Sequence, residues 1–293
     1  MALDLRAAFL NEPPSLDLIW PGFLSGTVGA LVAPGGVGKS FWALEAAMAI
    51  ACGVPGGDLV QLNPQRTGHV LYLAGEDPTP ALIQRVHAIG QHLCPRSRES
   101  IATNLTLLPI MGERLDIMSA PGLDRVRECC EETRLIVFDT LSRIHNLDEN
   151  SNSDMSYVLG RLEQLAVTSG AAVLFLHHVS KGSARDGQTD QQQAARGASA
   201  LIDNARWCGY VTRMTEGEAA RLSEHPSDRR PIGNDRRHQF LRFGVSKTNY
   251  GSTPPDRWFV RREHGVLVPA QLLETHRCND QKRSRGSYEP AAY

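Results

Sequence analysis

The sequence lacks the cysteine patterns that hold a zinc ion or a disulfide framework. Its six cysteines show no C-x-x-C spacing and no paired histidine ligands, which is typical of reduced intracellular thiols. No apolar run approaches the ~18 residues that a membrane span needs. A signal peptide is not indicated either, because Glu12 and two prolines follow the short apolar segment at the N-terminus. We therefore expect a cytoplasmic protein with no membrane partner.

An excess of charge of one sign is also missing. The formal net charge is −1 at pH 7, so no field of the whole molecule draws the protein onto nucleic acid. Contacts with DNA would have to be local, or be multiplied by symmetry, which argues mildly against a monomeric DNA-binding protein. With 293 residues, of which 41% are hydrophobic, the chain is long enough for one large α/β domain or two small ones.

The chain is organised around residues 33–40, which have the sequence Ala-Pro-Gly-Gly-Val-Gly-Lys-Ser. An apolar run precedes this stretch and a helical pattern follows it. A glycine-rich turn there faces its N–H groups inward and the helix adds its positive end, and together they hold a phosphate chain. Lys39 would reach the β- and γ-phosphates and the Ser40 hydroxyl would bind Mg²⁺, as in the P-loop pattern G-x-x-x-x-G-K-[ST]. Ala33 replaces the first glycine, which weakens the match without removing a phosphate ligand.

Apolar strands alternate with helices along the rest of the chain. Strands are expected at 27–34, 69–74, 105–110, 135–139 and 171–176, and helices at 38–52, 79–93, 121–132, 153–169 and 197–205. Strands that are apolar throughout imply a mostly parallel sheet with helices on both faces. Antiparallel strands are expected at the edge of this sheet, at 239–246, 258–262 and 266–268. The expected fold is an α/β NTPase core.

The chain divides into three predicted regions. Residues 1–24 mix apolar residues with prolines and form an arm, which lies either on a neighbouring molecule or on the domain itself. Residues 25–272 form the NTPase domain. The tail, residues 273–293, is polar, basic in patches and poor in apolar residues, which predicts disorder.

Candidate functional groups fall at or just past the ends of the expected strands, where ligands of parallel sheets gather. These groups are Lys39, Glu76, Asp139 and His178. Asp139 closes an apolar strand, where a carboxylate that holds Mg²⁺ belongs. Glu76 is the better candidate for polarising the attacking water, because Asp77 before Pro78 has the pattern of a helix N-cap. The expected ligands of the nucleotide and its Mg²⁺ are Gly35, Gly36, Val37, Gly38, Lys39, Ser40 and Asp139.

Further candidates are a histidine and several cations. His178 precedes a polar stretch, residues 179–196, and would contact the γ-phosphate and report its loss to that stretch. The alternative is a histidine satisfied by local hydrogen bonds, and for His177 this alternative is favoured. Arg196, Arg206 and Lys247 are candidates for a cation that reaches the nucleotide of a neighbouring subunit, although a lone arginine is more often a solvated or ion-paired surface group.

With these motifs collected, the chain resembles the RepA-type plasmid replicative DNA helicases, which belong to the hexameric, RecA-like helicases. The resemblance covers residues 16–272. Besides the P-loop it rests on the segments GEDP at 75–78, FDTL at 138–141, LHHVSKG at 176–182, DQQQAARG at 190–197, DNARW at 203–207 and FGVSKTNYG at 243–251. These later segments are far more specific than the P-loop.

The resemblance implies a RecA-like fold and a homo-hexamer that hydrolyses ATP, or another NTP, with Mg²⁺ at subunit interfaces. It implies that the ring unwinds forked DNA while it moves along a single strand, and that initiator and primase proteins are further candidate partners. The roles that it implies are Glu76 as catalytic carboxylate, Asp139 as Walker B acid, His178 as γ-phosphate sensor, Arg206 as arginine finger and Lys247 as second interfacial cation.

By the same resemblance, residues 179–196 correspond to a DNA-contacting loop, whose main cations are Lys181 and Arg185. With so few cations one copy would bind DNA weakly, whereas copies around one strand would sum and bind in a salt-dependent way. The loop has no aromatic residue, so we expect contacts with the DNA backbone and no base stacking.

Two alternative functions stay open. One is a RecA-like, DNA-dependent ATPase that loads or remodels replication or recombination proteins without unwinding DNA. The other is a nucleotide-gated regulatory or scaffold protein in which binding alone matters. Turnover stimulated by single-stranded DNA would exclude the scaffold, and strand separation would distinguish the two enzymes.

Overall fold

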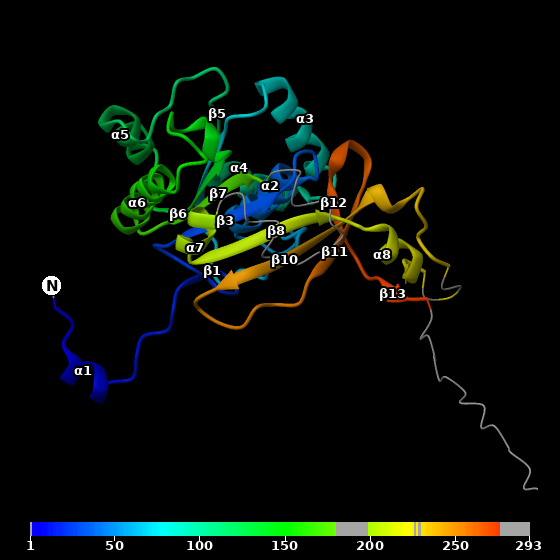
Figure 1. Cartoon of the computed structure of the whole chain (residues 1–293), viewed down its shortest axis with the longest axis horizontal. Coiled ribbons are helices and arrows are strands. Elements are labelled where there is room, and N and C mark those ends of the chain that lie inside the picture. Colours follow the sequence, from blue (N-terminus) through cyan, green and yellow to red (C-terminus); the bar gives the residue numbers. More distant parts are fainter. Residues whose placement is uncertain (1, 180–198, 226, 228–229, 276–293) are drawn as a thin grey trace, which may run out of the picture.

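The computed structural model describes residues 2–179, 199–225, 227 and 230–275. Its centre is a nine-stranded sheet with the order β12-β11-β10-β8-β3-β7-β6-β4-β5 (Figure 1). The parallel strands are β3 (Val28–Ala33), β4 (His69–Ala74), β5 (Leu105–Pro109), β6 (Thr133–Asp139), β7 (Ala172–His178) and β8 (Trp207–Arg213). The antiparallel edge consists of β10 (Phe240–Thr248), β11 (Arg257–Arg261) and β12 (Leu267–Ala270). The predicted α/β sheet with its antiparallel C-terminal edge is confirmed.

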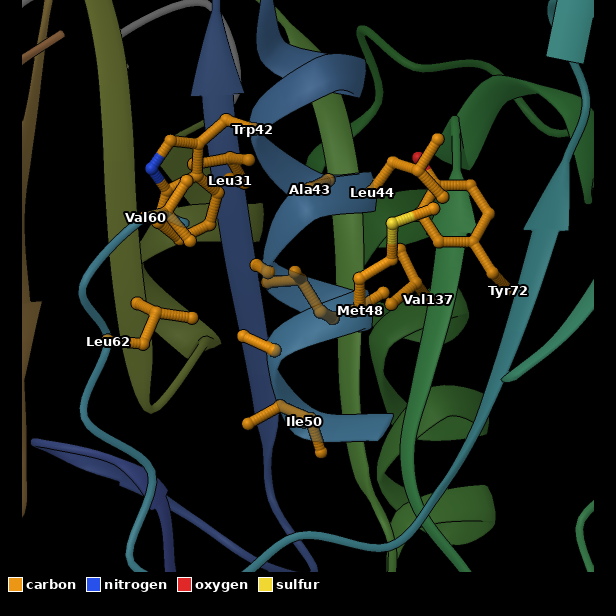
Figure 2. Close-up of a cluster of buried hydrophobic side chains, with 14 of the residues drawn as sticks. Leu31, Trp42, Ala43, Leu44, Met48, Ile50, Val60, Leu62, Tyr72 and Val137 are labelled. Carbon is orange, nitrogen blue, oxygen red and sulfur yellow. The ribbon is translucent and has the colours of Figure 1, made fainter. Parts of the chain in front are cut away.

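Helices cover both faces of this sheet. One face carries α2 (Lys39–Ala51), α3 (Thr79–Gly90) and α4 (Pro95–Asn104), and the other carries α5 (Ala120–Glu128), α6 (Asn152–Ser169) and α7 (Ser199–Asn204). Successive strand residues point to opposite faces. On one face of the sheet, Tyr72 of β4 and Val137 of β6 lie in the same buried cluster as Met48 of α2 (Figure 2). The residues that follow them, Leu73 and Phe138, point to the other face and belong to the core beneath α6. None of the described helices is long and apolar enough to cross a membrane.

The N-terminal segment contains α1 (Leu5–Leu10) and a small hairpin of β1 (Leu18–Trp20) and β2 (Phe23–Leu24). The ring of Trp20 lies 6.2 Å from that of Trp42 and 5.4 Å from that of Trp207, measured between centroids. The hairpin therefore packs on the domain itself, whereas α1 extends away from the body (Figure 1). The domain boundary at residue 25 stays a prediction, and most of the predicted disordered tail, residues 276–293, lies outside the described residues.

The helix boundaries differ from the prediction in two places. The helix expected at 79–93 ends at Gly90, and α4 follows where no element was expected. Only Ser97 and Ile101 of α4 are buried, so this helix shows no apolar period that would identify it. The helix expected at 121–132 ends at Glu128, because β6 begins at Thr133 and a turn must precede it. The short elements α8 (Glu216–Arg221), β9 (Leu222–Ser223) and β13 (Leu273–Glu274) also have no predicted counterpart.

A buried carboxyl joins α2 to the antiparallel edge. The side chain of Glu45 is 1% exposed, and its Oε1 accepts a hydrogen bond of 2.8 Å from the backbone N–H of Leu267. Its Oε2 has no hydrogen-bond partner among the described residues. Burial raises the pKa of Glu45 to about 8, and the hydrogen bond from Leu267 acts in the opposite direction. The carboxyl is therefore mostly protonated at neutral pH.

We expect Glu45 to make the folded protein less stable as the pH rises from 4.5 to about 8. Over this window the unfolded chain has released the proton, whereas the folded chain keeps it until its raised pKa is reached. The free energy of unfolding then falls by at most about 1.4 kcal/mol per pH unit through this group. Glu45→Gln keeps the acceptor for Leu267 and has no charge to titrate, so its urea-unfolding free energy should depend less on pH. Equal slopes for the two proteins would contradict this expectation.

Candidate nucleotide-binding site

The P-loop lies between the end of β3 and the start of α2. Gly36 and Gly38 have φ angles of +72° and +116°, a region that residues with a Cβ rarely adopt. The loop thereby turns Lys39 inward, where its side chain is only 4% exposed. Its Nζ has no hydrogen-bond partner among the described residues, and burial lowers the pKa of Lys39 while Asp139 and Glu76 act to raise it. A buried ammonium without a partner is costly, and a phosphate oxygen would supply that partner.

A hydroxyl and a carboxylate lie next to this lysine. The Oγ of Ser40 donates to Oδ1 of Asp139 over 3.1 Å, and the hydroxyl of Tyr72 donates to Oδ2 over 2.7 Å. Asp139 is 3% exposed. Burial raises its pKa, and the bonds from Tyr72 and Ser40 and the charge of Lys39 oppose this. Hydroxyl and carboxylate oxygens are the ligands that Mg²⁺ prefers, so Ser40 and Asp139 fit the metal that the P-loop pattern implies.

The register of β4 and β6 places a second carboxylate, that of Glu76, at the same end of the strands as Asp139. Ala74 lies opposite Asp139, and the N–H of Gly75 donates to the carbonyl of Asp139 over 2.6 Å. Glu76 follows, and its Oε1 lies 2.9 Å from Nε2 of His178 at the end of β7. The hydrogen bond from His178 is the main cause that lowers the pKa of Glu76. Glu76 is therefore ionised at neutral pH, the state that a group polarising water requires.

Several of these groups line one cavity of about 330 Å³, and Asp139 is buried behind Ser40. Its lining includes Lys39, Ser40, Glu76, Arg85, His178 and Arg261. Loop N–H groups, a buried ammonium and a helix N-terminus are all suited to bind anions. The cavity thus has the chemistry of a site for a phosphate chain.

The two neighbouring histidines face different surroundings. The side chain of His178 is 41% exposed and meets Glu76, whereas that of His177 is 7% exposed and has its Nδ1 3.9 Å from Glu149. Burial, followed by the charge of Lys39, lowers the pKa of His177 to about 4. His178 is therefore the histidine that lies at the cavity.

The prediction that Asp77 caps the following helix is wrong. The N-cap of α3 is Pro78, with no side-chain hydrogen bond. Asp77, which precedes α3, instead forms an ion pair of 2.5 Å with Arg85 in the second turn of that helix. The guanidinium of Arg85 also lies 5.0 Å from the ring centre of Phe41. The carboxylate of Asp77 therefore pairs with Arg85 at the cavity and does not accept a hydrogen bond from the first turn of α3.

The P-loop lies at the C-terminal ends of the parallel strands. Arg206 and Lys247 lie at the other end of these strands, near the start of β3. The backbone N–H of Arg206 donates to the carbonyl of Val28, the first residue of β3, over 2.8 Å. The P-loop follows the last residue of β3, roughly 17 Å away at about 3.3 Å per residue. Nζ of Lys247 donates to the carbonyl of Asp203, at the C-terminal end of α7, over 2.6 Å. The structure therefore does not bring these cations to the nucleotide cavity of their own chain.

The predicted DNA contacts, Lys181 and Arg185, lie in the segment 180–198, outside the described residues. The same holds for Arg196, a candidate for the interfacial cation. The first residue of the proposed loop, Val179, directly follows β7 and is buried.

Several residues at the site, Arg85 among them, have no counterpart in the sequence-based prediction. Tyr72 donates to Asp139, and Arg213 of β8 and Arg261 of β11 donate to carbonyls of the P-loop. A buried tyrosine in an apolar strand is a usable signal, because its hydroxyl needs a hydrogen-bond partner. The two arginines give no such signal, since each follows an ordinary strand pattern.

Fold and site together define a P-loop ATPase of the RecA-like class. Residues 1–184 match the model of AAA_25, a family described as an AAA domain, and this match spans more than half of the chain. The chain belongs to this family.

Two solved structures share the fold at low sequence identity. One, described as the ATPase domain of another protein, is 12% identical with a TM-score of 0.54, and the match covers 84% of this chain and 86% of that one. A second, described as a DnaB-like replicative helicase and its interactions with primase, is 12% identical with a TM-score of 0.57, and the match covers 83% of this chain and 57% of that one. The predicted RecA-like P-loop fold is thereby confirmed.

We expect Tyr72→Phe to weaken the binding of Mg²⁺–nucleotide about tenfold or more, because a group that orients a metal-binding carboxylate typically contributes ~10–100-fold to metal affinity. Titration calorimetry with ADP and Mg²⁺ measures this. Tyr210→Phe is the matched control, since the hydroxyl of Tyr210 also donates to a carboxylate over 2.7 Å, that of Asp256, and neither residue lines the cavity. Equal affinities for the two variants would show that Tyr72 has no role in metal binding.

Proposed function

We propose that this protein is an ATP-dependent, hexameric replicative DNA helicase that moves on single-stranded DNA and unwinds duplex. The observation that carries the ATPase part is the buried Lys39 ammonium, which has no hydrogen-bond partner among the described residues and lies beside the Ser40–Asp139 pair. The helicase part is supported by the sequence motifs after the P-loop and by the RecA-like fold.

The residues of the cavity would have different roles in ATP hydrolysis. Lys39 and the loop N–H groups hold the β- and γ-phosphates in place. Ser40 and Asp139 would hold Mg²⁺, which supplies charge neutralisation between these phosphates when it is bound. Glu76 polarises the water that attacks the γ-phosphate. Because His178 is hydrogen-bonded to Glu76, a γ-phosphate that draws His178 away would free this carboxylate for the water.

A neighbouring subunit would complete the site. Arg206 is exposed at the edge of the sheet away from its own P-loop, so it can serve as an arginine finger only for another copy. Lys247 lies at the same edge, held by carbonyls of α7, and is proposed as a second interfacial cation. Loss of the γ-phosphate would then remove a contact in each of two subunits, that of His178 in one and that of Arg206 in the next.

The movement of DNA would be linked to the segment after β7. His178 is at the cavity and Val179 follows it directly, so a shift of His178 is transmitted to the proposed DNA loop with Lys181 and Arg185. Single-stranded and forked DNA are the proposed substrates, with initiator and primase proteins as proposed partners.

Strand displacement on forked DNA with ATP and Mg²⁺ tests the proposed function. The wild-type protein should separate the strands, and Lys39→Ala should not, because it lacks the cation that holds the phosphates. Hydrolysis that single-stranded DNA stimulates, without strand separation, would contradict the helicase and favour a RecA-like remodelling ATPase. Nucleotide binding without any turnover would favour a nucleotide-gated scaffold.

A mixing experiment tests whether Arg206 acts on a neighbour. Alone, Arg206→Ala should lose ATPase activity by ~10³–10⁵-fold, as for other arginine fingers, and Lys39→Ala should be inactive. In an equimolar mixture some interfaces combine the intact Lys39 of one subunit with the intact Arg206 of the next, so part of the activity should return. A mixture as inactive as its two components would contradict action across an interface.

A further inference from the structure

Two arginines, one from the parallel strand β8 and one from β11 of the antiparallel edge, contact carbonyls of the P-loop. Nη2 of Arg213, the last residue of β8, donates to the carbonyl of Gly36 over 3.2 Å. Nη2 of Arg261, the last residue of β11, donates to the carbonyl of Val37. The two strands end at the same side of the sheet, because β10 pairs with both of them. Two successive carbonyls of the loop are thus held by two guanidinium groups.

This arrangement determines where the loop N–H groups point. In a planar trans peptide the C=O and the following N–H point in opposite directions. The carbonyl of Gly36 faces Arg213, so the N–H of Val37 points away from that arginine. The carbonyl of Val37 faces Arg261, so the N–H of Gly38 points away in the same manner. These N–H groups belong to the nest of backbone donors that P-loops offer to phosphate.

The P-loop lies close to Arg261 and Leu241 at Gly38. A Cβ added to Gly38 would lie 3.0 Å from Nη2 of Arg261 and 3.3 Å from Leu241, and the φ of Gly38 is +116°. The turn beyond β11 is equally close, since a Cβ on Gly265 would lie 2.7 Å from the ring of Phe41. The antiparallel edge therefore forms one wall of the P-loop.

The two arginines also bring positive charge that is not cancelled locally. Among the described residues neither Arg213 nor Arg261 forms an ion pair with a carboxylate, in contrast to Arg85 at the same cavity. Burial and the charge of Arg213 lower the pKa of Arg261, so the two guanidinium groups repel each other. An anion in the cavity would relieve this repulsion.

We propose that Arg213 and Arg261 are positioning residues of the phosphate site, which hold the P-loop carbonyls outward so that the N–H groups of Val37 and Gly38 face the nucleotide. Their hydrogen bonds go to carbonyls of the loop, so we expect them to act on nucleotide binding and not on the chemical step. This inference rests on the proposed function only in so far as the cavity binds a nucleotide.

The experiment measures the binding of ADP with Mg²⁺ by titration calorimetry, and the KM and kcat of ATP hydrolysis, for Arg213→Met and Arg261→Met. Each variant should bind ADP about tenfold more weakly, since a hydrogen bond from a charged donor is lost. KM for ATP should rise by a similar factor, while kcat stays within about twofold, as uniform binding predicts. Arg213→Lys and Arg261→Lys should recover part of the affinity, because a donor and its charge remain.

Arg262→Met is the matched control, because Arg262 is exposed next to Arg261 and its replacement changes the net charge equally without a P-loop contact. It should bind ADP as the wild type does. Arg213 is itself exposed, so Arg213→Met keeps the test valid even if Arg261→Met does not fold.

Wild-type affinity for ADP in Arg213→Met and in folded Arg261→Met would overturn the inference. So would a fall in kcat with unchanged KM, which would place the arginines in the chemical step. A wild-type protein that binds ADP but does not unwind DNA would overturn the proposed helicase and leave this inference standing. A wild-type protein that binds no ADP would overturn both.

Discussion

The buried ammonium of Lys39 is the constraint on which the rest of the site depends. The loop before α2 holds it at 4% exposure with no hydrogen-bond partner among the described residues. Desolvating a cation in this way is unfavourable, and the carboxylates of Asp139 and Glu76 offset the cost only through space. A phosphate oxygen removes the deficit. We therefore expect the folded loop to bind a phosphorylated ligand without a rearrangement of the sheet.

The order and direction of the strands determine which residues lie together at that site. The ends of β3, β4, β6 and β7 lie at one edge, so residues distant in sequence, such as Glu76 and His178, come within 2.9 Å. The starts of β3 and β8 lie at the other edge, where Arg206 is exposed. Each molecule therefore has the candidate nucleotide cavity at one end of its parallel strands and the exposed Arg206 at the other end. Such a head-to-tail pair of unlike surfaces closes into a ring when the rotation between neighbours allows it, which is the assembly that we propose.

The sequence alone predicted much of this arrangement, because apolar strands that alternate with helices leave few topologies. The placement of Lys39 and Asp139 at one strand edge followed directly from that pattern. The contact of Arg261 with Val37 did not, since it joins residues 224 positions apart and depends on how the antiparallel strands add to the sheet. Asp77 shows the reverse case, in which a local helix-cap pattern lost to an ion pair with Arg85. The cap prediction failed because the side chain of Asp77 pairs with a guanidinium group and not with the backbone N–H groups of the helix.

The most direct test of the account is a crystal structure with a non-hydrolysable ATP analogue and Mg²⁺. We expect the β- and γ-phosphates at Nζ of Lys39 and the loop N–H groups, the metal at Oγ of Ser40, and the γ-phosphate within reach of Glu76 and His178. Phosphates bound elsewhere, for example in the apolar groove between α3, α4 and β5, with Lys39 still buried and without a partner, would contradict the central claim that this lysine is held ready for a phosphate chain.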